Sequence, residues 1–152
     1  MSDSAGVCPE CGGAWPEGRT CQALFDEFLV WEFRDAAYGQ VHFLTVATFM
    51  TQHGRYTDEA QAWIQTQLRR HLEAGESVAD IRRQAQHTTS QAKRTWKVVR
   101  AAGDPPARKI AWTMTIGDVA LAHERSEYDA AVYRAQVTEW ARRTLQQLET
   151  NQ

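Results

Sequence analysis

The sequence predicts an all-α protein, an irregular bundle of five to six helices with an N-terminal zinc-knuckle loop. Apolar residues recur at helical spacing in several segments, whereas the period-two alternation typical of strands is nearly absent. A chain of 152 residues suits one domain, residues 1–152, because it can bury about two thirds of its unfolded surface without disulfides.

Residues 1–20 are expected to form a zinc-binding loop. Gly12, Gly13, Pro16 and Gly18 interrupt this stretch, and such residues mark turns and irregular backbone. Regular structure is therefore expected only from Cys21 onward.

A helical hairpin is predicted over residues 21–53. A broad apolar surface follows Cys21 and favours a helix that ends near residue 34. Residues 35–39 are expected to form a turn, and residues 40–53 a second helix that Gly54 is placed to end.

The middle helices are predicted over residues 57–100. Thr57 can cap a third helix, which Gly75 ends. Residues 77–80 have the S-x-x-D form of a capping box and predict the start of a fourth helix. Residues 84–95 are polar and weakly patterned, so that helix either continues through them or breaks and restarts.

The C-terminal helices are predicted over residues 115–149. Residues 103–106 read as a loop, and residues 109–115, rich in β-branched and aromatic side chains, could form a short strand. Residues 115–118 and 126–129 both have the capping-box form, and the second is expected to open a strongly amphipathic helix.

Composition points to a soluble, cytoplasmic protein that does not enter a membrane. Apolar residues make up 43% of the chain and the net charge is −2, and no stretch approaches the roughly 20 apolar residues that cross a bilayer. The first residues lack the features of a secretory signal. An odd number of cysteines, three, favours reduced thiols over a disulfide framework.

Positive charge is concentrated in one segment, residues 81–110. It could attract phosphates, nucleic acid or an acidic partner, or it could be an ordinary solvated helix face. Its basic residues are Arg82, Arg83, Lys93, Arg94, Lys97, Arg100, Arg108 and Lys109.

Cys8, Cys11 and Cys21 are predicted to bind one structural Zn²⁺. Zinc is held by thiolates and imidazoles in a tetrahedron, and a C-x-x-C turn followed by glycines brings two sulfurs together. Redox chemistry would need a preceding thioredoxin-like strand, which this sequence does not predict. Unliganded thiols are the remaining alternative.

The hairpin register selects His53 as the fourth ligand. Cys21 precedes the turn at residues 35–39 by as many positions as His53 follows it, so an antiparallel hairpin sets them side by side. The same register pairs Glu32 with His42. The two histidines lie about 16 Å apart along a helix axis at 1.5 Å per residue, so both cannot bind one ion. His42 is the alternative fourth ligand if the register differs.

Glu32 and His42 form a second candidate site. Burying an acid and an imidazole is costly unless they bond each other. The pair is either a structural hydrogen bond that fixes the hairpin or an open metal or acid-base site. Signatures of nucleotide-binding loops, serine hydrolases and H-E-x-x-H metalloproteases are missing from the sequence. Further members of an open site could be His71, His87, Asp118 and His123.

The opening of the chain resembles a small bacterial family known only as a domain of unknown function. The resemblance rests on Cys8-Pro-Glu-Cys11-Gly12, Cys21, Glu32-Phe33, Tyr38-Gly39-Gln-Val-His42 and Gln52-His53. It implies that the three cysteines, Glu32, His42 and His53 occupy motif positions, consistent with a metal site and a second polar site. It implies no activity.

Three functions follow from these features. The leading hypothesis is a binding or regulatory module with a structural zinc and a protein or small-molecule partner. The alternative is a metal-dependent, hydrolase-like enzyme with an open site at Glu32 and His42. The third is nucleic-acid binding through residues 81–110.

Overall fold

The computed structural model describes residues 6–84 and 97–151. Within them every regular element is a helix, and the β-type pairing is limited to two isolated bridges. Residues 78–84 are also helical. The all-α prediction is therefore confirmed. The named elements are η1 (Pro16–Gly18), α1 (Cys21–Arg34), α2 (Ala36–Gly39), α3 (His42–Gln52), α4 (Asp58–Leu72), α6 (Ile116–Arg125) and α7 (Ala130–Thr150).

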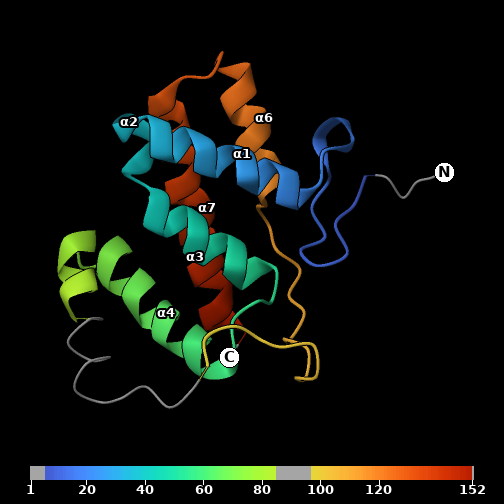
Figure 1. Ribbon diagram of the computed structural model, residues 1–152, viewed down its shortest axis with the longest axis vertical. Helices are drawn as coiled ribbons and strands as arrows, with labels where there is room; N and C mark the ends of the chain where they lie inside the picture. Colours follow the sequence, from blue (N-terminus) through green and yellow to red (C-terminus); the bar gives the residue numbers. More distant parts are fainter. Residues whose placement is uncertain (1–5, 85–96, 152) are drawn as a thin grey trace.

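The long helix α7 organises the fold. It packs against α2, α3, α4 and α6, and in Figure 1 it runs behind the hairpin formed by α1 and α3. Tyr133, Val137, Trp140, Ala141 and Leu145 of α7 are all buried in the hydrophobic core. The α1–α3 hairpin thus lies across a helix whose apolar stripe follows the helical period that the sequence predicts.

The hairpin forms as predicted, with one difference at its turn. The Thr20 hydroxyl caps α1 by accepting from the backbone N–H of Ala23 at 3.1 Å. The segment expected as a turn is instead the short helix α2, because the Asp35 side chain caps it by accepting from Ala37 N–H at 2.9 Å. Figure 1 shows the chain passing from α1 through α2 and back along α3.

The predicted starts of the third and fourth helices are confirmed. The Thr57 hydroxyl accepts from Ala60 N–H at 3.2 Å at the start of α4. The Ser77 hydroxyl accepts from Asp80 N–H at 3.1 Å, next to the helical residues 78–84. The question of how that helix continues through residues 84–95 falls mostly outside the described residues, as do His87, Lys93 and Arg94.

Two predictions near the C-terminus are wrong. Residues 109–115 form no strand, because their backbone pairs with a side chain of α7: Gln147 accepts from Thr113 N–H and donates to Ala111 O, each at 2.9 Å. The last helix begins at Ala130, not at Ser126. Glu127 and Tyr128 have positive φ angles of 60° and 65°, which no α-helix accommodates.

The basic segment makes many contacts within the molecule. Arg108 and Lys109 donate to the backbone carbonyls of Asn151 and Pro9. Three other cations form ion pairs: Arg83 with Asp80, Lys97 with Asp104 and Arg100 with Asp58. Nucleic-acid binding by this segment stays a prediction. Among the described helices, none has the length and apolar character needed to cross a membrane.

Candidate metal centre

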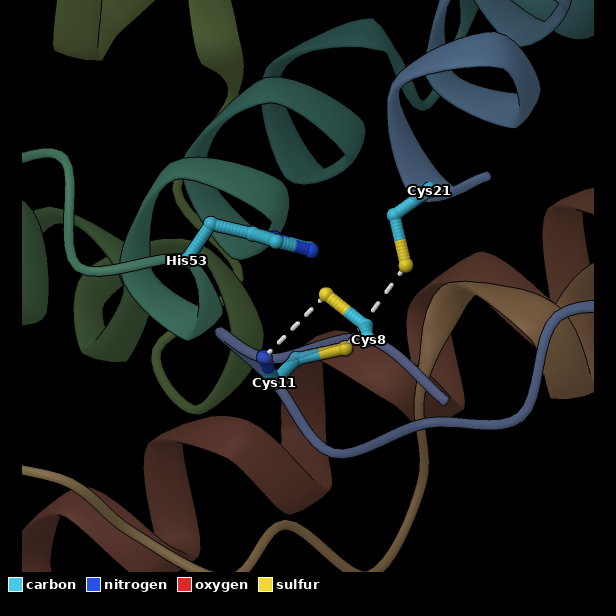
Figure 2. Close-up of side chains that lie close together, drawn as sticks. All are labelled: Cys8, Cys11, Cys21 and His53. Carbon is cyan, nitrogen blue, oxygen red and sulfur yellow. Dashed lines mark hydrogen bonds between the residues drawn. The ribbon is translucent and has the colours of Figure 1, made fainter. Parts of the chain in front are cut away.

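Four side chains from distant positions converge at the N-terminal end of α1. The sulfurs of Cys8, Cys11 and Cys21 and a ring nitrogen of His53 all lie within 4.8 Å of one another. Each residue is only 3–4% exposed. Figure 2 shows the three sulfurs and the His53 ring facing a common point. Cys21 is the first residue of α1 and His53 directly follows α3, so the predicted register brings this pair together.

The Cys8–Cys11 loop has the hydrogen bonding of a metal knuckle. The backbone N–H groups of Glu10 and Cys11 point at Cys8 Sγ, and Gly13 N–H points at Cys11 Sγ, each over 3.4 Å. A second pairing, Cys8 N–H to Gly13 O at 2.9 Å, closes the loop. Amides aimed at sulfur stabilise the thiolate form, which is the form that binds metals.

The knuckle is fixed against the start of α6. Gly13 lies so close to Thr115 that a Cβ at position 13 would stand 2.4 Å from the threonine Oγ1. Glu10 also forms an ion pair with Arg55 at 2.9 Å. Only glycine permits this approach, so the loop is docked where its sulfurs meet Cys21 and His53.

The His53 ring is oriented as a nitrogen donor. Its Nδ1 is 2.8 Å from the carbonyl oxygen of Phe49. A carbonyl can only accept, so Nδ1 carries the proton and Nε2 keeps its lone pair. Nε2 is buried and has no hydrogen-bond partner in the described part of the chain. A buried polar atom without a partner is costly, and a metal ion would satisfy it.

Cys11 and Cys21 are coupled electrostatically. Their sulfurs lie 3.7 Å apart and share a hydrogen bond. That bond lowers the pKa of Cys11 to about 4 against the opposing effect of burial, and it raises the pKa of Cys21. Their separation also suits a common ion, since thiolates about 2.3 Å from a tetrahedral zinc lie about 3.8 Å apart.

The four residues therefore fit a tetrahedral metal ion with three sulfur donors and one nitrogen donor. All three cysteines are free of disulfides. Within residues 6–84 and 97–151, no other cluster of three or more His, Cys, Asp or Glu side chains has this proximity.

Glu32 lies at the other end of the hairpin, and its carboxylate is fully engaged. The side chain is 1% exposed. Its Oε1 lies 2.7 Å from His42 Nδ1, as the register predicts. Its Oε2 accepts from the hydroxyls of Thr45 at 2.5 Å and Tyr133 at 2.6 Å. Three donors satisfy a buried carboxylate that would otherwise be strongly destabilising.

The surroundings of Glu32 have two further consequences. Burial, together with the Glu32 charge, raises the pKa of Tyr133, so this phenol remains a proton donor. Gly39 allows the chain to pass close to Glu32, because a Cβ there would lie 2.8 Å from the Glu32 carbonyl oxygen. A larger residue at position 39 would push the end of α2 away from the end of α1.

The other proposed members of an open site have separate roles. The Nδ1 of His71 bonds to the Glu76 carbonyl at 2.7 Å. The Asp118 carboxylate accepts from Thr115 N–H at 2.8 Å and caps α6. His123 bonds to the Tyr38 hydroxyl at 2.7 Å. The described residues thus bring none of these three to the Glu32–His42 pair.

Sequence reasoning missed two of the three donors to Glu32. Thr45 follows His42 by three positions, so it shares a helix face with it and could have been found from helical spacing. Tyr133 lies 101 positions beyond Glu32, and only the packing of α7 brings it there. No local pattern predicts that contact.

The chain belongs to the family of unknown function DUF5946, whose model matches residues 6–149. The resemblance identified from the opening motif is thereby confirmed. No curated protein and no solved structure matches the chain.

Proposed function

We propose that this protein is a binding or regulatory module stabilised by one structural Zn²⁺, held by Cys8, Cys11, Cys21 and His53. The observation that carries the proposal is the buried, unpartnered His53 Nε2 facing three free thiols. Thiolate-rich sites with one imidazole favour zinc over harder cations such as Mg²⁺ and Ca²⁺.

A structural role fits the closed surroundings of the cluster. Four protein donors complete a tetrahedral shell and leave no open position for a substrate. The residues are almost inaccessible to solvent, whereas catalytic zinc sites keep a coordination position for water or substrate. The ion would join the N-terminal loop to the start of α1 and the end of α3.

The proposed compartment follows from the thiols. Three buried free cysteines must remain reduced to bind a metal, and the cytoplasm keeps thiols reduced. We therefore propose a cytoplasmic protein.

A metal-dependent enzyme with Glu32 as a ligand is the weaker alternative. Both carboxylate oxygens of Glu32 already accept hydrogen bonds from protein donors. A metal there would have to displace at least one buried hydroxyl or the His42 ring.

Metal analysis of matched variants tests the proposal. Protein purified without a metal-affinity tag should contain one zinc per chain, as should the His42→Ala variant. The His53→Ala and Cys11→Ala variants should have lost most of it. Full zinc occupancy in Cys11→Ala would refute the proposed ligands, and a second metal equivalent lost in His42→Ala would support the enzyme alternative.

A further inference from the structure

The two histidines near the ends of α3 present their rings in the same way. In each ring Nδ1 bonds to an acceptor within the hairpin, Phe49 O for His53 and Glu32 for His42. His53 Nε2 is buried without a partner among the described residues, and the hydrogen bonding of His42 within the described residues is confined to Nδ1. The difference is access: His53 is buried, whereas the His42 side chain is 29% exposed. His42 therefore offers a fixed ring nitrogen to a molecule from outside.

His42 borders a small cavity whose walls are mainly apolar. The cavity has a volume of about 190 Å³ and lies where α3 meets α4 and residues 78–84. Typical ligand pockets measure roughly 300 to 1,000 Å³, so only a small molecule fits here. The apolar part of the wall consists of Phe43, Val46, Ala47 and Ile64.

A guanidinium group borders the same cavity. Arg82, an exposed residue of the helical stretch 78–84, lines it together with His42. Neighbouring Arg83 is paired with Asp80, but Arg82 forms no ion pair with a described residue. None of the described residues that line the cavity carries a carboxylate. An imidazole and a guanidinium that forms no ion pair with a described residue, both beside an apolar wall, favour an anion that carries an apolar body.

We propose that this cavity binds a small organic carboxylate, held by His42 Nε2 and the Arg82 guanidinium, with its apolar part on α3 and α4. In the complex, the His42 ring bonds to Glu32 through Nδ1 and to the ligand carboxylate through Nε2–H. The site belongs to the opposite end of the hairpin from the cysteines and does not depend on the bound metal.

Glu32 acts in this site as a positioning residue. Thr45 and Tyr133 hold its carboxylate in place, and the carboxylate in turn fixes the plane of the His42 ring. The ligand does not reach Glu32, because the Glu32 side chain is buried behind His42. The network thereby fixes the His42 ring at the edge of the cavity before any ligand arrives, which reduces the entropy lost on binding.

Titration of the full chain with sodium benzoate tests this proposal, with the His42 ring signals followed by NMR in slightly acidic buffer. Benzoate should shift these signals saturably, and benzamide, its neutral counterpart, should not. Arg82→Ala should weaken benzoate binding about tenfold, the usual effect of losing a charge-assisted contact. The matched control, Arg83→Ala, should leave the affinity unchanged.

Because Arg82 is exposed, its replacement should not disturb folding. Absence of a saturable shift at His42 in the natural chain would overturn the proposal. So would equal benzoate affinity in the Arg82→Ala and Arg83→Ala variants, which would place the carboxylate elsewhere.

Discussion

The two ends of the α1–α3 hairpin are built from the same parts, a histidine of the α3 segment opposite a polar residue of α1. At the Cys21 end, His53 Nε2 lies among three thiols and is unpartnered. At the Glu32 end, every oxygen of the carboxylate has a donor. The Cys21 end therefore has donor atoms that a metal ion would satisfy, whereas at the Glu32 end protein donors already satisfy the carboxylate.

The donors and acceptors around a buried polar group therefore distinguish two kinds of group. A group with all its capacity satisfied stabilises the fold or orients a neighbour. A buried acceptor that has no partner and also lies among metal-binding side chains, as His53 Nε2 does, marks a position where a metal ion can bind. Variants at the two ends of the hairpin test that distinction.

Removing the metal should have the largest effect, because the ion joins the N-terminal loop to both helices. With zinc at about a thousand times its dissociation constant, binding adds about 4 kcal/mol to the free energy of unfolding. Urea unfolding with and without a chelator measures this loss. Cys11→Ala should be insensitive to the chelator, and equal stability of the natural chain under both conditions would contradict a structural ion.

Glu32→Ala should destabilise the fold by about 3 kcal/mol, because it leaves the buried Tyr133 hydroxyl without its acceptor and limits the Thr45 hydroxyl to the Val41 carbonyl. Zinc content should stay the same, which separates this end of the hairpin from the other. Glu27→Ala, an exposed position on the same helix, serves as the control and should change stability by no more than about 0.5 kcal/mol. Loss of zinc in Glu32→Ala would contradict the conclusion that only the Cys21 end of the hairpin is involved in metal binding.

Tyr133→Phe should cost about 2 kcal/mol, since it deletes one hydrogen bond to a buried charge and keeps the ring packing. Tyr128→Phe is the matched control because Tyr128 is 60% exposed. Denaturant titration of both variants gives the comparison. A negligible change in the free energy of unfolding of Tyr133→Phe would contradict a stabilising role for the hydrogen bond between Tyr133 and Glu32.

A third histidine tests whether an unpartnered nitrogen alone implies a metal. The Tyr38 hydroxyl donates its proton to Tyr128 O at 2.9 Å, so its oxygen must accept from His123 Nε2–H. In the neutral ring, His123 Nδ1 is then unprotonated. His123 Nδ1 is buried without a partner, but no group of metal donors surrounds it. We expect no metal there and a neutral ring.

The consequence for His123 is a dependence of stability on pH. Burial lowers the pKa of His123 in the folded protein, so the unfolded chain binds the proton more readily. The contribution of neutral His123 to the free energy of unfolding is complete above the ordinary histidine pKa of about 6.5. It is lost as the pH falls below that value, by at most about 1.4 kcal/mol per pH unit. His123→Gln should flatten the dependence of unfolding free energy on pH in that range. An unchanged slope would contradict a neutral buried ring.

Much of the candidate site could be predicted from the sequence because helices have a fixed pitch. Counting from the turn places Cys21 beside His53 and Glu32 beside His42, and the structure contains both pairs. The replacement of the expected turn by α2 did not disturb this register.

The remainder depends on contacts that no local pattern contains. The positive φ angles of Glu127 and Tyr128 delay α7, although neither residue is glycine. The expected strand at residues 109–115 is replaced by pairing with the Gln147 side chain. Arg82 was predicted only as part of a basic surface, and its place beside His42 results from the packing of residues 78–84 against α3 and α4.

X-ray absorption at the zinc edge tests directly whether three cysteines and one histidine hold the Zn²⁺, because it reports the donor atoms around the ion. We expect three sulfurs at about 2.3 Å and one nitrogen at about 2.0 to 2.1 Å in the natural chain and in His42→Ala alike. The small amount of zinc that His53→Ala retains should lack this nitrogen. A shell of nitrogen and oxygen donors alone, or loss of the nitrogen in His42→Ala, would contradict the assignment of Cys8, Cys11, Cys21 and His53.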